Sequence, residues 1–130
     1  YVDILTPNKQ GAMKLTNTNS PRAALNKFID WGVEVIVITL GKEGSMAATK
    51  NGIIKVPGFD IKPIDTTGAG DTFCASFDYA YTIQEWPLEK CCQFANAAAA
   101  LKCLKIGART GMPTINQVNE FIITKGDKNE

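Results

Sequence analysis

The chain has 130 residues, enough for one domain that buries its own core without disulfides or metals. Its 14 basic and 13 acidic residues leave a formal charge of +1, so charge favours neither nucleic acid nor an anionic membrane as a partner. No apolar run approaches the ~20 residues that cross a bilayer, which excludes a membrane-spanning helix.

The first predicted elements alternate between strand and helix. The apolar run Val2–Thr6 predicts a buried strand, which Pro7-Asn8 is expected to turn into a loop. Ser20-Pro21 is typical of a helix start, and Gly32 is expected to end that helix. The continuous β-branched run Val33–Leu40 predicts a strand covered on both faces in a parallel sheet.

A hairpin and two helices follow. Ser45–Thr49 and Ile53–Val56 flank Asn51-Gly52, which is a strong signal for a tight turn between two strands. Apolar residues at three- and four-residue spacing predict a helix that begins at Asp71 and ends at about Ile83. A longer helix is expected from about Pro87 to Leu104. This order predicts a layered α/β domain.

The last predicted helix is opened by Thr114, and the chain becomes polar after Ile123. We therefore expect an ordered part over residues 1–123 and a polar, frayed tail over 124–130. Four cysteines lack C-x-x-C spacing and the chain has no histidine, so a zinc site is not expected. Reduced thiols in a cytoplasmic core fit this composition better.

Eight residues carry the strongest chemical signal: Asp65-Thr66-Thr67-Gly68-Ala69-Gly70-Asp71-Thr72. The first amides of a helix have no internal partner, and the helix dipole adds partial positive charge there. Gly68 and Gly70 allow an anion to approach these amides closely. A carboxylate at Asp71 is suited to accept a proton from a hydroxyl that attacks phosphorus. The alternative is that Asp71 is only an N-cap beside an ordinary glycine loop.

Further motifs, in the same order along the chain, resemble the ribokinase/PfkB carbohydrate-kinase family. They are Thr6-Pro7-Asn8, Thr39-Leu40-Gly41-Lys42-Glu43-Gly44, the octet continued by Phe73, Phe94-Ala95-Asn96-Ala97-Ala98-Ala99-Ala100 and Gly107-Ala108-Arg109. The resemblance covers almost the whole chain but only the C-terminal, nucleotide-binding half of family members. It implies the C-terminal portion of a ribokinase-like α/β/α fold, with the ATP-binding part over residues 1–123.

The resemblance also implies roles for individual residues. Asp71 would be the catalytic base, and the amides of Gly68, Ala69 and Gly70 would stabilise the transferring phosphoryl group. The nucleotide contacts that it implies are Asn8, Thr39, Gly41, Gly44 and Asn96. The alanines after Asn96 have a sufficient structural explanation in close helix packing.

The resemblance implies a potassium site as well, beside the anion-binding loop. Asp65 and Thr67 match its first set of oxygen ligands, and backbone carbonyls around Lys102, Lys105 and Gly107 match its second set. A hard cation with several oxygen ligands would also order the glycine loop.

One departure from the family concerns Mg²⁺. The family usually places an acid three residues after the asparagine of Pro-Asn, and here that residue is Gly11. A charged oxygen that helps to organise Mg²⁺ and phosphate is therefore missing. A water network, another acid or reduced catalysis would each accommodate this change.

The expected function is ATP-dependent phosphorylation of a sugar hydroxyl, with ATP, Mg²⁺ and K⁺ as cofactors. The half that supplies most sugar contacts in the family has no counterpart, so the isolated chain is expected to be inactive. A non-catalytic nucleotide-binding or interaction module remains open, as does a kinase with a nucleoside or vitamin-like acceptor. Expected partners are ATP and a small sugar, and a homodimer of the complete protein is kept open. The P-loop pattern and the Rossmann fingerprint are both unmet.

Overall fold

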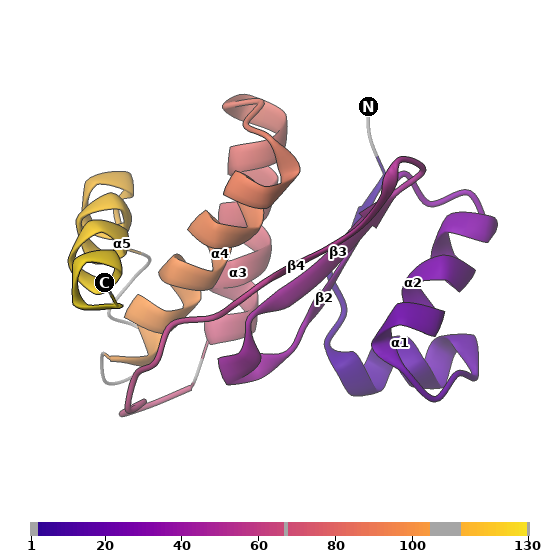
Figure 1. Ribbon diagram of the computed structural model, residues 1–130, viewed down its shortest axis with the longest axis horizontal. Helices are drawn as coiled ribbons and strands as arrows, with labels where there is room; N and C mark the ends of the chain where they lie inside the picture. Colours follow the sequence, from indigo (N-terminus) through magenta and orange to yellow (C-terminus); the bar gives the residue numbers. More distant parts are fainter. Residues whose placement is uncertain (1–2, 67, 105–112, 130) are drawn as a thin grey trace. The chain divides into compact units, whose positions relative to one another are not determined.

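The computed structural model describes residues 3–66, 68–104 and 113–129. The chain separates into two units, Tyr1–Pro57 and Gly58–Glu130, and each is described by itself. Figure 1 labels most of the helices and strands of both.

The first unit is built on a four-stranded sheet in the order β1-β2-β3-β4. Its strands are β1 (Ile4–Leu5), β2 (Val35–Thr39), β3 (Ser45–Thr49) and β4 (Gly52–Val56). The predicted hairpin is confirmed, since β3 and β4 pair antiparallel from Thr49↔Gly52 to Ser45↔Val56. The expectation of a parallel sheet holds only for β1 and β2, because β2 and β3 also pair antiparallel. The sheet is therefore mixed.

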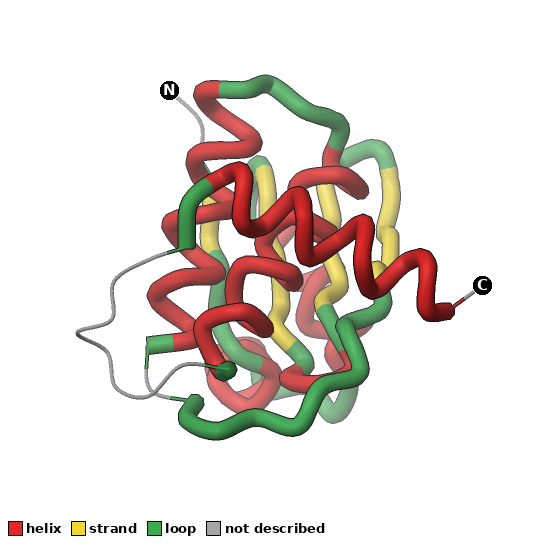
Figure 2. Tube along the Cα trace, turned by 90° about the vertical axis from the view of Figure 1, so that its left-hand side faces the viewer, coloured by secondary structure: helices red, strands yellow, loops and turns green. Residues whose placement is uncertain are grey.

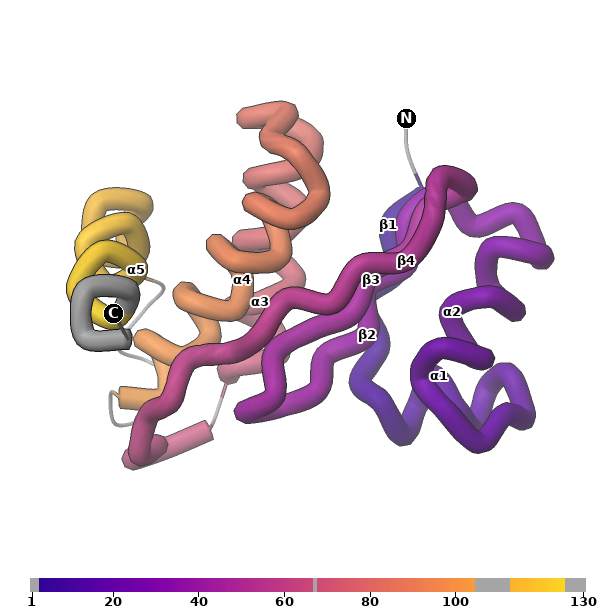
Figure 3. The backbone as a smooth tube through the Cα atoms, in the orientation of Figure 1, coloured from indigo at the N-terminus to yellow at the C-terminus, as the bar shows by residue number. Residues whose placement is uncertain are grey.

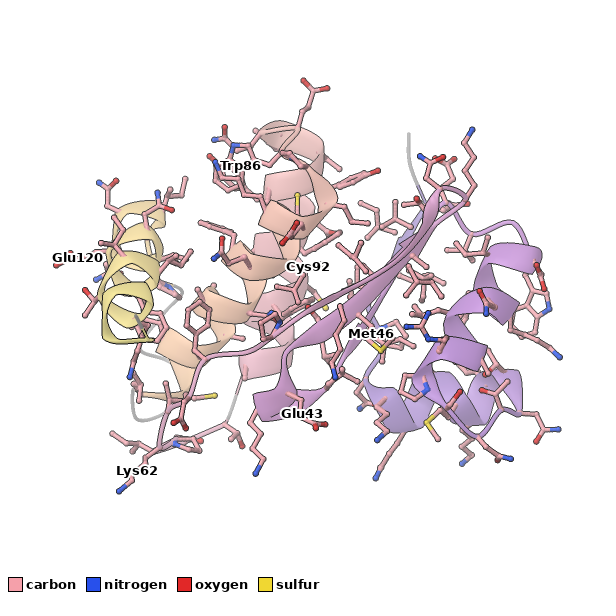
Figure 4. All side chains as sticks on the ribbon, in the orientation of Figure 1. Glu43, Met46, Lys62, Trp86, Cys92 and Glu120 are labelled. Carbon is pink, nitrogen blue, oxygen red and sulfur yellow. The ribbon has the colours of Figure 1, made fainter. Side chains whose placement is uncertain are left out.

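Two helices, α1 (Lys9–Thr16) and α2 (Pro21–Asp30), cover one face of this sheet (Figure 1). Alternate residues of β2 and β3 face them, and Met46, labelled in Figure 4, belongs to this set. The core cluster contains Ala12, Ala24, Leu25, Phe28, Ile36, Ile38, Met46 and Ala48. Val35 and Val37, which alternate with these residues along β2, are buried as well. The burial of consecutive residues agrees with the expected strand.

Helix α1 replaces the loop that we expected after Pro7-Asn8. The Asn8 side chain caps it by accepting a hydrogen bond from the Gly11 amide at 2.7 Å. Asn17 ends it in the left-handed conformation with φ 54°. The prediction failed because the apolar stripe of α1 is weak, with only Ala12 and Thr16 buried. Helix α2 begins as predicted, with the Ser20 side chain capping the Ala23 amide.

The second unit is helical. Its elements are α3 (Ala69–Asp78), η2 (Tyr79–Ile83), α4 (Leu88–Cys103) and α5 (Ile115–Asn129). Helix α3 begins two residues before the expected Asp71 and widens into the π-helical turn η2. Along these two elements, Phe77 stacks between Phe73 at 6.3 Å and Tyr81 at 5.8 Å, measured between ring centroids. This row of rings supports the predicted apolar face.

Helix α5 is opened by Thr114, as predicted. The Thr114 amide donates to Gln117 Oε1 at 2.8 Å and the Gln117 amide donates to Thr114 Oγ1 at 3.1 Å, which is a capping box. The helix continues to Asn129, through residues that we expected to fray after Ile123 (Figure 2). No proline interrupts this stretch, so the helix can propagate. The division at residue 123 as a functional boundary stays a prediction.

Candidate functional site

The glycine octet forms the tight turn at the start of α3. Gly68 is the N-cap residue, with φ 79° and ψ 1°, a left-handed conformation that favours glycine. The Ala69 amide donates to the Thr66 carbonyl at 3.2 Å and the Thr72 amide donates to the Gly68 carbonyl at 2.9 Å. The turn therefore leads directly into the first turn of α3, where amides have no i→i−4 partner within the helix.

Asp71 lies in the first turn of α3 and its side chain is exposed. The cap position belongs to Gly68, and no side chain caps this helix. The alternative that Asp71 is only an N-cap is therefore wrong. An exposed carboxylate in the first turn of the helix is accessible to a substrate hydroxyl, which is the first geometric requirement for a general base.

Space at the helix start is the next feature of the loop. An added Cβ at Gly70 would meet no heavy atom within 4 Å, and Gly70 does not have a positive φ. Contacts among the described residues therefore do not explain why residue 70 is glycine. Space for an anionic ligand beside the amides of the first turn would explain it.

The segment that leads into the octet is anchored on the end of α4. The amides of Ile64 and Asp65 both donate to the Cys103 carbonyl, at 2.8 and 3.0 Å. Burial, and secondarily the Asp65 charge, raise the pKa of the Cys103 thiol. Lys102, one residue earlier, is only 3% exposed. Asp65 and the end of α4, which the potassium prediction combines, are thus brought together.

The other potassium ligands predicted from sequence, Thr67, Lys105 and Gly107, lie outside the described residues. Among the residues that the structure describes, no group of three or more Cys, Asp or Glu side chains is placed to hold a metal ion. A cation here would therefore need backbone carbonyls, phosphate oxygens or water as ligands. The potassium site stays a prediction.

In the first unit, predicted nucleotide contacts gather at the carboxyl end of β1 and β2. Asn8 forms a parallel bridge with Thr39, and the Thr39 amide donates to the Pro7 carbonyl at 3.1 Å. The 3-10 turn η1 (Gly41–Glu43) follows, closed by the Leu40 amide on the Gly44 carbonyl at 2.8 Å. The ends of strands are where open α/β sheets bind ligands.

The two glycines of this turn both have positive φ. Gly41 has φ 63°, and Gly44 has φ 101° with ψ −128°. An added Cβ at Gly41 would meet nothing within 4 Å, so the turn is open there. Exposed Glu43, labelled in Figure 4, lies on the same turn.

Gly11, where the family usually has an acid, lies in the first turn of α1. An added Cβ would come within 3.0 Å of Asn8 Oδ1, which already accepts the Gly11 amide. The missing carboxylate has no substitute in α1, whose first turn contains no acidic residue. The first turn of α1 therefore offers no charged oxygen of the kind that Mg²⁺ prefers as a ligand.

Asn96 lies on α4 and is 7% exposed. Buried alanines surround it along the helix, which agrees with the packing explanation for that stretch.

Sequence reasoning missed Ser45, at the end of the Gly44 turn. Its hydroxyl is buried and accepts or donates no hydrogen bond among the described residues. Only its place directly after the glycine turn could have singled it out.

A family model described as "pfkB family carbohydrate kinase" matches residues 1–115. Ribokinase of Staphylococcus aureus strain COL is 35% identical over 124 residues, which cover 92% of this chain and 41% of the relative. ATP-dependent 6-phosphofructokinase of Thermoanaerobacterium thermosaccharolyticum is 32% identical over 120 residues, covering 92% and 37%.

Among solved structures, Arabidopsis thaliana ribokinase complexed with ribose and ATP superposes with a TM-score of 0.83 at 32% identity. The superposition covers 92% of this chain and 40% of that one. The fold is therefore a ribokinase-like α/β fold, as the motifs implied. The chain spans about two fifths of the length of the relatives named above. The chain belongs to the pfkB family of carbohydrate kinases.

Proposed function

We propose that this chain supplies the nucleotide site, the anion-binding loop and the catalytic base for ATP-dependent phosphorylation of a sugar hydroxyl. The observation that carries the proposal is the start of α3: a left-handed Gly68, open space at Gly70 and an exposed Asp71. These three features put first-turn amides and a carboxylate at one helix end. Phosphoryl transfer needs that combination, because charge develops on the phosphoryl oxygens while the attacking hydroxyl loses its proton.

The proposed roles follow from this chemistry. Asp71 accepts the hydroxyl proton, and the amides of residues 68–70 stabilise the negative charge on the transferring group. A contribution from the Ala69 amide requires it to leave its 3.2 Å hydrogen bond to the Thr66 carbonyl or to share it. We expect this loop to reorganise slightly when the nucleotide binds.

Asn8, Thr39, Gly41, Gly44 and Asn96 are the proposed nucleotide contacts. Open backbone at Gly41 would let phosphate oxygens approach, and Asn96 has an amide suited to the base or ribose. Mg²⁺, when bound with ATP, supplies positive charge that offsets the phosphate charge. K⁺ would be held by Asp65, Thr67 and the carbonyls of Lys102, Lys105 and Gly107.

Binding and turnover are tested in two steps. Calorimetry with ATP and Mg²⁺ measures whether the 130-residue chain binds nucleotide. A coupled ADP-release assay on the complete protein then surveys sugars, nucleosides and vitamin-like alcohols as acceptors. ATP-dependent turnover with a sugar supports the proposal, whereas preferred turnover of a nucleoside or vitamin-like alcohol would reassign the acceptor. Phosphorylation by the isolated chain would contradict the expectation that the acceptor half is needed.

Gly11 favours a second candidate, a nucleotide-binding or interaction module without catalysis. The absent carboxylate weakens the handling of Mg²⁺, which turnover needs more than binding does. ATP binding without ADP release for any acceptor would select this candidate.

A further inference from the structure

Residues 58–65, which we call the strap, connect β4 to the anion-binding octet without regular secondary structure (Figure 3). Its middle is exposed, and Lys62, labelled in Figure 4, points away from the helices. A segment of this kind lacks the repeating backbone hydrogen bonds of a helix or strand. Its position therefore depends on what holds its two ends.

Helix α5 holds the first end. The rings of Phe59 and Phe121 lie 5.2 Å apart between centroids with a tilt of 60°. Lys125 Nζ donates to the Asp60 carbonyl at 3.3 Å and lies 6.0 Å from the centroid of the Phe121 ring. Two neighbouring side chains of one helix face thus contact two consecutive residues of the strap.

The end of α4 holds the second end. The Cys103 carbonyl accepts both the Ile64 and the Asp65 amide, so one acceptor fixes two consecutive peptide groups. Gly68 follows three residues after Asp65. The position of the anion-binding loop therefore depends on where the strap is bound to the end of α4. The position of the strap there is restricted by its contact with α5.

We propose that α5 positions the anion-binding loop: Phe121 and Lys125 hold the strap so that residues 68–71 are presented to the phosphoryl group in one place. The proposal rests on the proposed function. Phe121 and Lys125 are positioning residues, because they contact the strap and not the loop itself. They lie on α5, after residue 115, where the match to the family model ends. Their effect on phosphoryl transfer is indirect, through the loop.

The chemistry is sensitive to such positioning. Phosphoryl transfer depends on placement and electrostatics more than on covalent participation by the protein. A displacement of about 1 Å can cost about 100-fold in rate. A looser strap should therefore lower kcat more than it raises KM for ATP, because the loop amides are proposed to serve the transition state more than the ground state.

The test compares Phe121→Ala with Ile123→Ala, a change on the same helix at a side chain that is 63% exposed. Residue-resolved hydrogen exchange by NMR on the 130-residue chain measures protection of the Ile64, Asp65 and Ala69 amides, each of which donates a backbone hydrogen bond. We expect Phe121→Ala to speed exchange at these amides at least tenfold relative to the middle of α4, and Ile123→Ala to leave it unchanged. Lys125→Met should give a smaller effect that Lys125→Arg reverses.

In the complete protein, Phe121→Ala should lower kcat about tenfold with little change in KM for ATP, and Phe121→Tyr should restore it. Unchanged exchange at Ile64 and Asp65, or a uniform increase throughout α3 and α4, would overturn the proposal. If Phe121→Ala does not fold, Phe59→Ala removes the same ring contact from the strap side and is judged by the same criteria. Hydrogen exchange can be measured without catalysis. A protein without kinase activity would therefore contradict the proposed function, and the exchange rates would still decide whether α5 positions the loop.

Discussion

Gly70→Ala should separate the stability of the anion-binding loop from its chemistry. The added methyl group meets no heavy atom within 4 Å, and the residue lies inside α3 without a positive φ. Replacing glycine by alanine in a helix stabilises it by about 0.5–1 kcal/mol. For a chain of 130 residues this raises Tm by roughly 2–5 °C.

The same methyl group fills the space through which an anion would reach the first amides of α3. Loss of one donor of this kind typically costs about 10²–10³ in turnover. We therefore expect Gly70→Ala to bind ATP·Mg²⁺ more weakly than the parent chain, and to lose less affinity for ADP·Mg²⁺, because ADP lacks the γ-phosphate. In the complete protein, kcat should fall by about 100-fold.

Gly68→Ala is the matched control, because its φ of 79° opposes any side chain. The left-handed conformation costs a non-glycine residue about 1–2 kcal/mol, so this variant should unfold at a lower temperature. Differential scanning calorimetry and titration calorimetry on the two variants give stability and affinity separately. A Gly70→Ala chain that binds ATP as well as the parent would refute the argument that residue 70 borders the phosphate.

Four other changes test the account. Gly11→Glu should move the Asn8 side chain slightly and lower the Mg²⁺ concentration for half-maximal ATP binding severalfold. Gly11→Gln should leave that concentration unchanged. Equal Mg²⁺ dependence of the two variants would contradict the argument that the missing acid weakens Mg²⁺ binding. Burial raises the pKa of the Cys91 thiol from 9.0 to about 11. As pH rises, the Cys91 thiol therefore loses its proton in the unfolded chain before it does so in the folded chain. Its contribution to the free energy of unfolding is complete below pH 9 and is lost between pH 9 and 11. Thermal unfolding across that range should show a steeper decline in the parent than in Cys91→Ala, and parallel curves would contradict the shift. Thr114→Ala removes the cap of α5 and should cost about 1 kcal/mol of unfolding free energy in urea titrations, whereas a change below 0.3 kcal/mol would argue against a cap that matters. ADP release by the complete protein should be faster in potassium than in sodium or tetramethylammonium chloride, and equal rates would dismiss the cation site.

Much of the fold was predictable because several elements carry local signals that agree with their packing. The Asn51-Gly52 hairpin, the capped start of α2 at Ser20 and the start of α5 at Thr114 were each predicted from turn or capping residues. Helix α1 was missed since its signal is one asparagine cap with almost no apolar periodicity. Pairing direction also escaped prediction, because a buried β-branched run such as β2 suits a mixed sheet as well as a parallel one.

The local backbone of the candidate site was predictable where its conformation requires particular residues. Gly68 and Gly44 have positive φ, and an added Cβ at Gly70 would meet open space, as expected for a glycine in the octet. The anchoring of the strap was not predictable, because Phe59 and Phe121 are 62 positions apart and no local pattern connects them. Contacts of this kind arise from tertiary packing, which a single sequence does not specify by spacing.

The most direct test of the central claim is Asp71→Asn in the complete protein. The substitution keeps the size and position of a side chain in the first turn of α3 and removes its ability to accept a proton. Steady-state ADP release and titration with ATP·Mg²⁺ should show turnover reduced by at least about 100-fold with ATP affinity nearly unchanged. A loss of only two- or threefold would contradict the assignment of Asp71 as the catalytic base.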